Sequence, residues 1–150
     1  AELAAAEDLS RERRLPEGPS IGPHMSVRER FALRAAFEAA VRAVERNAAC
    51  GALFDGLQFD GSEALYRSRY RTVASPGERA HCAPTVAAVA EVGGSRILIC
   101  WRFHDLGRLN RVATLIHEAL HTAGLGEWPH DPRGMTPREI TERVKRECGL

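Results

Sequence analysis

The sequence lacks several features that would place it in a common class. No apolar stretch approaches the roughly 18 residues that a membrane-spanning helix requires. No basic segment with interleaved aromatic residues is present, and 21 Lys and Arg are balanced by 20 Asp and Glu, so nucleic acid is not an expected partner. Repeats and low-complexity segments are also missing. With 150 residues, the chain is long enough for one domain with a modest core.

Cysteine is scarce and lacks the spacing of a structural metal site. The four cysteines contain no C-x-x-C pair, which argues against a zinc ribbon and against a redox motif. An even number in a small domain fits two disulfides and an oxidising compartment, the alternative being four free thiols in a cytosolic protein. We expect Cys82 to pair with Cys100, because they flank a predicted hairpin. Cys50 and Cys148, at the ends of the first and last predicted helices, are then left for each other.

The first 25 residues differ in character from the rest. Residues 1–14 are rich in Ala, Glu and Arg and are compatible with a helix, which the sequence LPEGP at 15–19 would end. Residues 22–25, Gly-Pro-His-Met, look like the remnant of a cleaved expression tag. We therefore divide the chain into an N-terminal extension, 1–25, and a domain, 26–150. The extension is a native segment, a pro-segment or an addition for expression, and the missing hydrophobic leader predicts a trimmed or mature form.

Capping residues mark the start of the main helices. Ser26 with Glu29 three residues later is a capping-box pattern, and it opens a helix whose apolar stripe reaches about residue 48. Thr136, followed by Pro137 and Glu139, opens the last helix in the same way. Two more helices are expected, over residues 62–71 and 109–123.

A two-glycine turn predicts a β-hairpin. Residues 85–92 and 96–103 are β-rich runs on either side of Gly93-Gly94. Facing positions should then sum to about 187, which places Cys82 beyond the ladder, in a loop folded back over the strand end. An extended substrate can add to the edge of such a strand. Helices and hairpin together predict a small single α+β domain with flanking helices and a β-hairpin or small sheet.

The most informative segment is the stretch 117–127, which reads HEALHTAGLGE. Because an α-helix has about 3.6 residues per turn, His117 and His121 lie on the same helix face and can bind one metal ion together. Glu118 lies at the edge of that face, where a general base is needed. The alternative interpretation is an ordinary amphipathic helix with two surface histidines.

The third metal ligand is expected just after this helix. Gly124 lies where the helix should stop, since glycine accepts the left-handed cap conformation without steric cost. The turn then brings Glu127 back toward the two histidines. His130 and Asp131 are rivals, and histidine is the commoner zinc ligand, but the chain direction favours Glu127 because it arrives first.

Three protein ligands would leave the fourth position of a tetrahedral zinc ion open, as in catalytic sites. Water at that position has its pKa lowered to about 7, and Glu118 would take its proton and pass it to the leaving amine. Five residues are chemically able to assist the developing oxyanion, and the sequence does not choose among them: Tyr66, Tyr70, His104, His130 and Arg133.

The stretch 117–127 resembles the H-E-x-x-H-x-x-G-x-x-H/D signature of the metzincin metallopeptidases. The resemblance implies three zinc ligands, a general base and a turn glycine: His117, His121 and Glu127, then Glu118, then Gly124. It also implies a methionine turn beneath the metal, for which Met135 is the candidate. Glu in the third ligand position departs from the family's His or Asp. The segment is also similar to small bacterial secreted proteins of unassigned function that share an HTxGLGE core.

We therefore expect a secreted or periplasmic zinc metallo-endopeptidase that hydrolyses a peptide or protein substrate with one catalytic zinc ion. Two alternatives stay open. One is a secreted binding or inhibitory protein that keeps the zinc helix without catalysis. The other is a zinc amidase that acts on cell-wall peptide. The presence of Glu118 favours an enzyme, because a purely structural zinc site needs no base.

Overall fold

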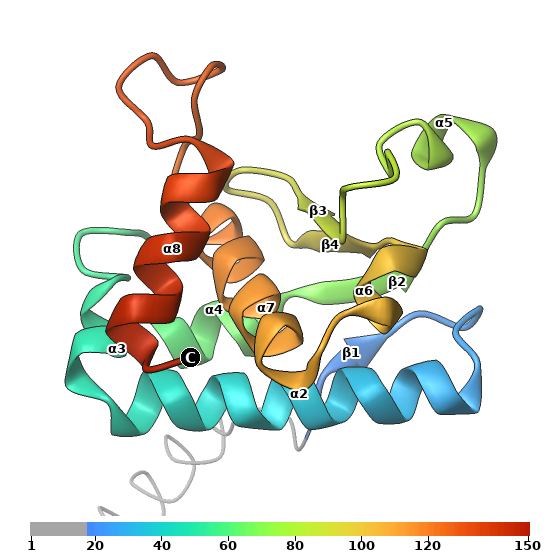
Figure 1. Ribbon diagram of the computed structural model, residues 1–150, viewed down its shortest axis with the longest axis horizontal. Helices are drawn as coiled ribbons and strands as arrows, with labels where there is room; N and C mark the ends of the chain where they lie inside the picture. Colours follow the sequence, from blue (N-terminus) through green and yellow to red (C-terminus); the bar gives the residue numbers. More distant parts are fainter. Residues whose placement is uncertain (1–17) are drawn as a thin grey trace, which may run out of the picture.

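In the computed structural model, which describes residues 18–150, a small mixed sheet lies beside a group of helices (Figure 1). The four strands are β1 (Ser20–Ile21), β2 (Arg69–Thr72), β3 (Ala88–Ala90) and β4 (Arg96–Ile99). Their order across the sheet is β1-β2-β4-β3, with β1, β2 and β4 parallel and β3 antiparallel to β4. Strand β3 therefore forms one edge of the sheet. This combination of helices and a small sheet confirms the predicted α+β class.

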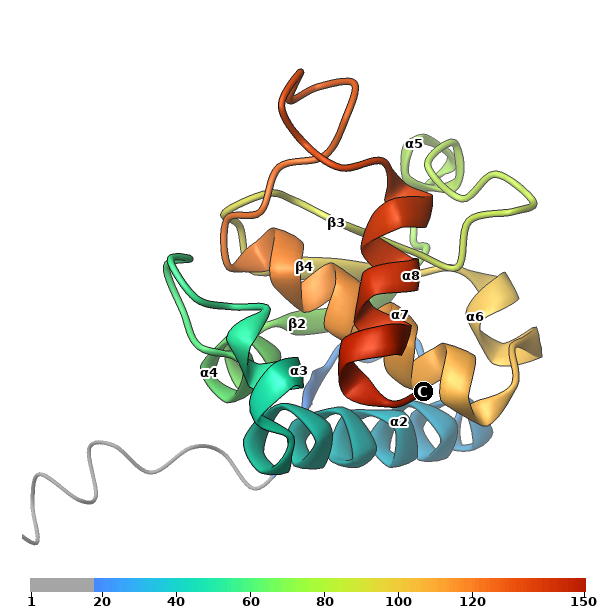
Figure 2. The same cartoon turned by 60° about the vertical axis from the view of Figure 1, so that its left-hand side comes forward.

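The described residues form seven helices: α2 (Val27–Arg46), α3 (Ala48–Ala52), α4 (Gly61–Arg67), α5 (Pro76–Arg79), α6 (Trp101–Asp105), α7 (Arg108–Thr122) and α8 (Pro137–Cys148). Figures 1 and 2 show the long helix α2 beneath α7, with α8 beside α7. The main core lies where these three helices meet the sheet, and it includes Phe37, Ile97, Ile116 and Ile140, all almost fully buried. The predicted helix over residues 1–14 lies outside the described residues. Part of the predicted extension 1–25 is described and contains β1.

Both N-caps form where the sequence predicts them, but the reciprocal capping box is complete only at α2. At the start of α2, the Ser26 hydroxyl accepts from the Glu29 amide, and the Glu29 carboxylate accepts from the Ser26 amide. At the start of α8, the Thr136 hydroxyl accepts from the Glu139 amide and donates to the Glu139 carboxylate. The first helix and the last helix therefore begin at the predicted residues.

The hairpin has the predicted register but shorter strands. Ala88 faces Ile99 and Ala90 faces Ile97, so facing positions sum to 187. The second strand ends at Ile99, and α6 follows in place of the predicted continuation to residue 103. Trp101 is 59% exposed whereas Phe103 is fully buried. In a strand, residues 101 and 103 would lie on the same face and would be similarly buried. In the helical turn of α6 they lie on different sides, which explains why one is exposed and the other buried.

The predicted helix over 62–71 is wrong in its last part. Helix α4 ends at Arg67, Ser68 is extended, and Tyr70 lies in strand β2. Tyr70 pairs with Ile97 of β4 and is completely buried, and its hydroxyl donates to the Leu65 carbonyl oxygen. A pairing between segments so far apart in the chain outweighs the local helical pattern.

Two disulfides join the elements in the predicted pairs. Cys50 of α3 is bonded to Cys148 at the end of α8. Cys82, in the segment after α5, is bonded to Cys100, which directly follows β4. This second bridge packs with Leu98 on the sheet face opposite the main core. Disulfides of this kind are typical of proteins in oxidising compartments.

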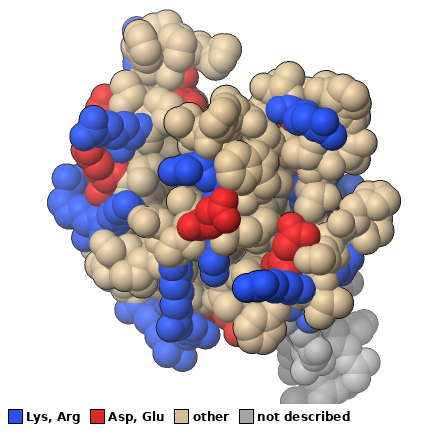
Figure 3. Space-filling view, turned by 45° about the vertical axis from the view of Figure 1, so that its right-hand side comes forward, with Lys and Arg blue, Asp and Glu red and all other residues tan. Residues whose placement is uncertain are grey.

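Two surface properties agree with the composition. None of the helices in the described part of the chain is both long and apolar enough to span a membrane. Acidic and basic side chains are interspersed on the face shown in Figure 3, as the small formal charge of +1 leads us to expect.

Candidate metal centre

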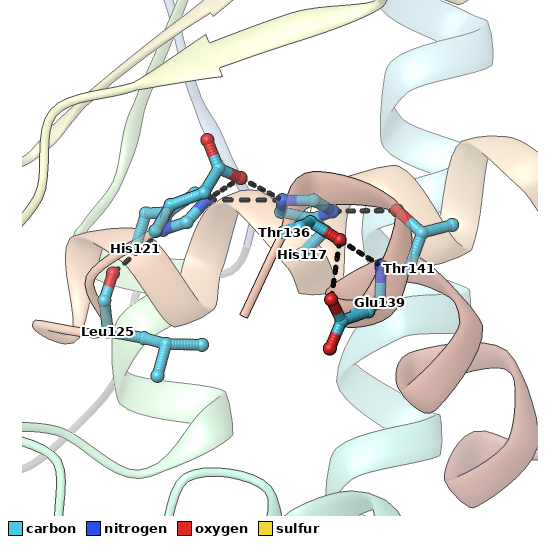
Figure 4. Close-up of polar contacts among 7 residues, drawn as sticks. His117, His121, Leu125, Thr136, Glu139 and Thr141 are labelled. Atoms are coloured by element: carbon cyan, nitrogen blue, oxygen red, sulfur yellow. Dashed lines mark hydrogen bonds and ion pairs between the residues drawn. The ribbon is translucent and has the colours of Figure 1, made fainter. Parts of the chain in front are cut away.

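Helix α7 brings His117 and His121 to one face, and Figure 4 shows their rings turned toward each other. The ring centroids are 4.9 Å apart and the two Nε2 atoms 3.1 Å apart. Both side chains are buried, with exposed fractions of 7% and 5%. The histidines are therefore not surface residues of an ordinary amphipathic helix.

Two glycines allow the chain to turn back after α7. Gly124 has a φ of 113°, a conformation that glycine adopts far more readily than other residues. At Gly126 there is no room for a side chain, because a Cβ would lie 2.6 Å from Oδ2 of Asp131. The turn places Oε1 of Glu127 3.3 Å from Nε2 of His117 and 3.2 Å from Nε2 of His121. The three residues that the sequence predicts as ligands are thus brought together.

The spacing of these three atoms fits a metal ion. Around a tetrahedral zinc with bonds of about 2.0–2.1 Å, ligand atoms are separated by roughly 3.3 Å. The three separations between Nε2 of His117, Nε2 of His121 and Oε1 of Glu127 are 3.1, 3.3 and 3.2 Å. The cluster is therefore compact enough to hold a single cation.

Hydrogen bonds on the far side of each ring orient the histidines. Nδ1 of His121 lies 2.8 Å from the Leu125 carbonyl oxygen, which can only accept, so Nδ1 carries the proton and Nε2 presents its lone pair to the cluster. Nδ1 of His117 lies 2.8 Å from the hydroxyl oxygen of Thr141 on α8. Such outer partners fix ring orientation in metal sites.

The electrostatics of the cluster also favour the metal-binding forms of His117 and Glu127. Burial lowers the pKa of His117, and the charge of a protonated His121 would lower it further, while Glu127 opposes the shift. The pKa of Glu127 is lowered, first by its hydrogen bond with His117. A neutral imidazole and an ionised carboxylate are the forms in which His117 and Glu127 would bind a divalent cation.

Glu118 lies next to the cluster and is 7% exposed. Burial raises the pKa of its carboxyl well above the usual value, and the charge of Glu127 raises it further, whereas a backbone hydrogen bond from Ala90 of β3 lowers it. Glu118 lines the same groove as the histidines and Glu127. The groove has a volume of about 840 Å³ and lies between α7, α8 and the edge strand β3.

The rival third ligands lie outside the cluster. His130 is exposed and lines the groove, but it does not belong to the group of three potential ligands. The Asp131 carboxylate accepts from the Arg133 amide. Met135 is partly buried against the core, and its carbonyl oxygen accepts from the Trp128 amide, which closes the loop after Glu127.

Four of the five candidate oxyanion residues are not part of the groove wall. Tyr70 is buried in the core, and Nε2 of His104 lies 3.2 Å from Oε2 of Glu29. Neither they nor Tyr66 and Arg133 line the groove, which leaves His130 as the candidate that does.

Sequence reasoning missed two features of this site. Thr141, which contacts His117, lies 24 residues away in the sequence. Pro137, Thr141 and Lys145 of α8 all line the groove. Their four-residue spacing places them on one helix face, and this spacing was the available signal.

Comparisons with known proteins add no assignment. No family model, no curated protein and no solved structure matches the chain at a significant level.

Proposed function

We propose that the protein is a zinc metallo-endopeptidase. His117, His121 and Glu127 would hold one zinc ion, and Glu118 would be the general base. The observation that carries the proposal is the convergence of three potential ligand atoms within 4.8 Å of one another, in a groove that also contains a buried carboxyl group. A structural site commonly has four protein ligands, whereas three ligands leave a position for substrate or water.

A zinc ion bound there would supply a Lewis acid and make water nucleophilic near neutral pH. Glu118 would accept the proton of the attacking water and transfer it to the leaving amine. Its position beside the ligand pair on α7 suits this transfer. Burial raises the pKa of its carboxyl, and a hydrogen bond from the Ala90 backbone opposes that shift. Thr141 and the Leu125 carbonyl would keep the two imidazoles oriented throughout.

Strand β3 supports a peptide substrate in particular. It lies at the edge of the sheet, and Ala88, Val89 and Ala90 line the groove. An edge strand has backbone groups that can hydrogen-bond an extended peptide. A substrate chain added to this edge would pass the metal ligands of α7.

We also propose that the protein is secreted or periplasmic. Its two disulfides support this location, because such bonds persist in oxidising environments and are rare in the cytosol.

The test compares the zinc-loaded protein with Glu118→Gln on a library of quenched fluorescent peptides. The variant should keep its zinc and lose roughly 10²–10⁴-fold in kcat/KM. Glu142→Gln, on the exposed side of α8, is the matched control and should cleave like the unmodified protein. Loss of zinc in Glu118→Gln would make Glu118 a ligand. If the unmodified protein cleaves no peptide, the peptidase proposal fails. Cleavage of cell-wall peptide alone would then indicate an amidase, and no cleavage at all a binding protein.

A further inference from the structure

The groove extends well beyond the candidate metal centre. On α7, the lining residues reach from Asn110 through Thr114 to His121. At about 1.5 Å per residue, this is a length of roughly 16 Å along the helix. The groove can therefore contact several residues of a bound chain on one side of the metal centre.

Two cationic side chains line the groove from elements that lie toward the N-terminal end of α7, away from Glu127. Lys145 on α8 is one turn beyond Thr141, which itself contacts His117. Figure 1 shows α7 and α8 running in opposite directions, so the C-terminal part of α8 lies beside the N-terminal part of α7. Arg102, on the short helix α6 that precedes α7, lines the groove as well.

The charges along the groove are strongly segregated. Its acidic lining residues are Glu118 and Glu127, and both belong to the candidate centre. At the other end, Lys145 and Arg102 form no side-chain ion pair or hydrogen bond with any residue from 18 to 150. Lys145 is also half-buried, whereas Arg102 is exposed. A partly desolvated cation without a partner costs free energy, and a bound anion would remove that cost.

We propose that this end of the groove binds a carboxylate of the substrate, so that the protein prefers acidic peptides. The inference rests on the proposed function for the position of the cleaved bond. Lys145 is four residues beyond Thr141, about 6 Å along α8, and Asn110 is seven residues before His117, about 10 Å along α7. An extended chain advances about 3.3 Å per residue. The carboxylate therefore lies two to three residues from the cleaved bond. It belongs to an Asp or Glu side chain or to the C-terminus of the substrate.

Binding is measured first, with fluorescent peptides and zinc-loaded Glu118→Gln protein, which holds the peptide without cleaving it. The peptides are compared in pairs. The two members of a pair are identical except for Glu in one and Gln in the other, at the second or third position from the cleaved bond. A second set compares a free with an amidated C-terminus, which separates the two sources of the carboxylate. The acidic member of a pair should bind about fivefold more tightly, and added salt should reduce the difference.

The variants Lys145→Gln and Arg102→Gln should each reduce this preference, and the double variant should abolish it. Lys145→Arg should retain it. Arg146→Gln is the matched control, since Arg146 is on the same helix, is exposed and does not line the groove. Equal binding of acidic and neutral peptides, no binding of any acidic peptide, or a preference that survives the double variant would overturn the inference.

Cleavage by the unmodified protein then separates this inference from the proposed function. A charge preference in binding without hydrolysis would support the groove and contradict the peptidase. Hydrolysis with equal kcat/KM for Glu and Gln peptides would support the peptidase and contradict the groove.

Discussion

The hydroxyl oxygen of Thr141 lies 2.8 Å from Nδ1 of His117, so the last helix of the chain orients a candidate metal ligand on α7. Neither nitrogen of the His117 ring is left free, because Nε2 faces His121 and Glu127. The position of α8 is itself fixed by the disulfide between Cys50 and Cys148. The geometry of the candidate centre therefore depends on the tertiary fold as well as on the local motif.

Thr141→Val should weaken zinc binding by roughly 10–100-fold, because it removes the hydrogen bond that orients His117 while keeping the side-chain shape. Thr141→Ser should bind nearly as well as the unmodified protein. Competition with a chromogenic chelator measures the affinity. The control is Thr114→Val, since Thr114 lines the groove but its hydroxyl donates to the Asn110 carbonyl oxygen. Equal losses in the Thr141 and Thr114 variants would mean that the contact with His117 has no special role.

Glu127, and not His130, should determine metal content. The unmodified protein should retain about one zinc per chain after mild dialysis, because the three ligand atoms converge. Glu127→Ala should lose most of this zinc, whereas His130→Ala should keep it. Metal content is measured by elemental analysis of the dialysed proteins. The opposite pattern would make His130 the third ligand, and an unmodified protein without zinc would contradict the site altogether.

Much of the candidate site could be predicted because its residues are close in the sequence. The i, i+4 spacing of His117 and His121 and the glycine turn before Glu127 are local, and helical geometry turns them into a cluster. The hairpin register could be predicted in the same way, since facing positions sum to the expected 187. The turn itself differs from the predicted Gly93-Gly94 loop, because the Gly94 amide donates to the Glu91 carbonyl oxygen and the ladder ends at Ala90 and Ile97.

Features that depend on distant contacts could not be predicted in this way. Tyr70 continues a helical pattern in the sequence, but pairing with β4 places it in a strand. Thr141 and Lys145 became part of the site only when α8 was placed beside α7. The four-residue spacing of Pro137, Thr141 and Lys145 indicates that they share a helix face, but only the tertiary fold shows that this face meets the histidines.

The two disulfides should contribute unequally to stability. Cys50 and Cys148 are 98 residues apart, and Cys82 and Cys100 are 18 apart. In the chain-entropy model, the longer loop stabilises by about 4–5 kcal/mol and the shorter by about 3 kcal/mol. Replacing both cysteines of each pair by Ala should therefore cost more for the first pair, as measured by urea unfolding. A larger loss for the Cys82–Cys100 pair would show that native packing, not loop entropy, determines the difference.

His104 should make the protein less stable as the pH falls below about 7. Its pKa is lowered, first by burial, while the nearby Glu29 carboxylate opposes this shift. Nε2 lies 3.2 Å from the carboxylate but makes no hydrogen bond with it. An unfolded histidine titrates near 6.5, so between that value and the lower native pKa the unfolded chain binds a proton that the native protein does not. The stabilisation is thus present above about pH 6.5 and lost as the pH falls through the native pKa.

The measurement is the free energy of unfolding between about pH 7.5 and pH 5, a range that avoids most carboxyl titration. Comparing the unmodified protein with His104→Gln, both with saturating zinc, cancels the contribution of the other histidines. The unmodified protein should lose more stability across this range than the variant. Glu29→Gln keeps the capping-box pattern but removes the carboxylate that opposes the shift, so its loss should be steeper than that of the unmodified protein. If the unmodified protein instead gains stability relative to His104→Gln as the pH falls, attraction to Glu29 outweighs burial and the native pKa of His104 is raised.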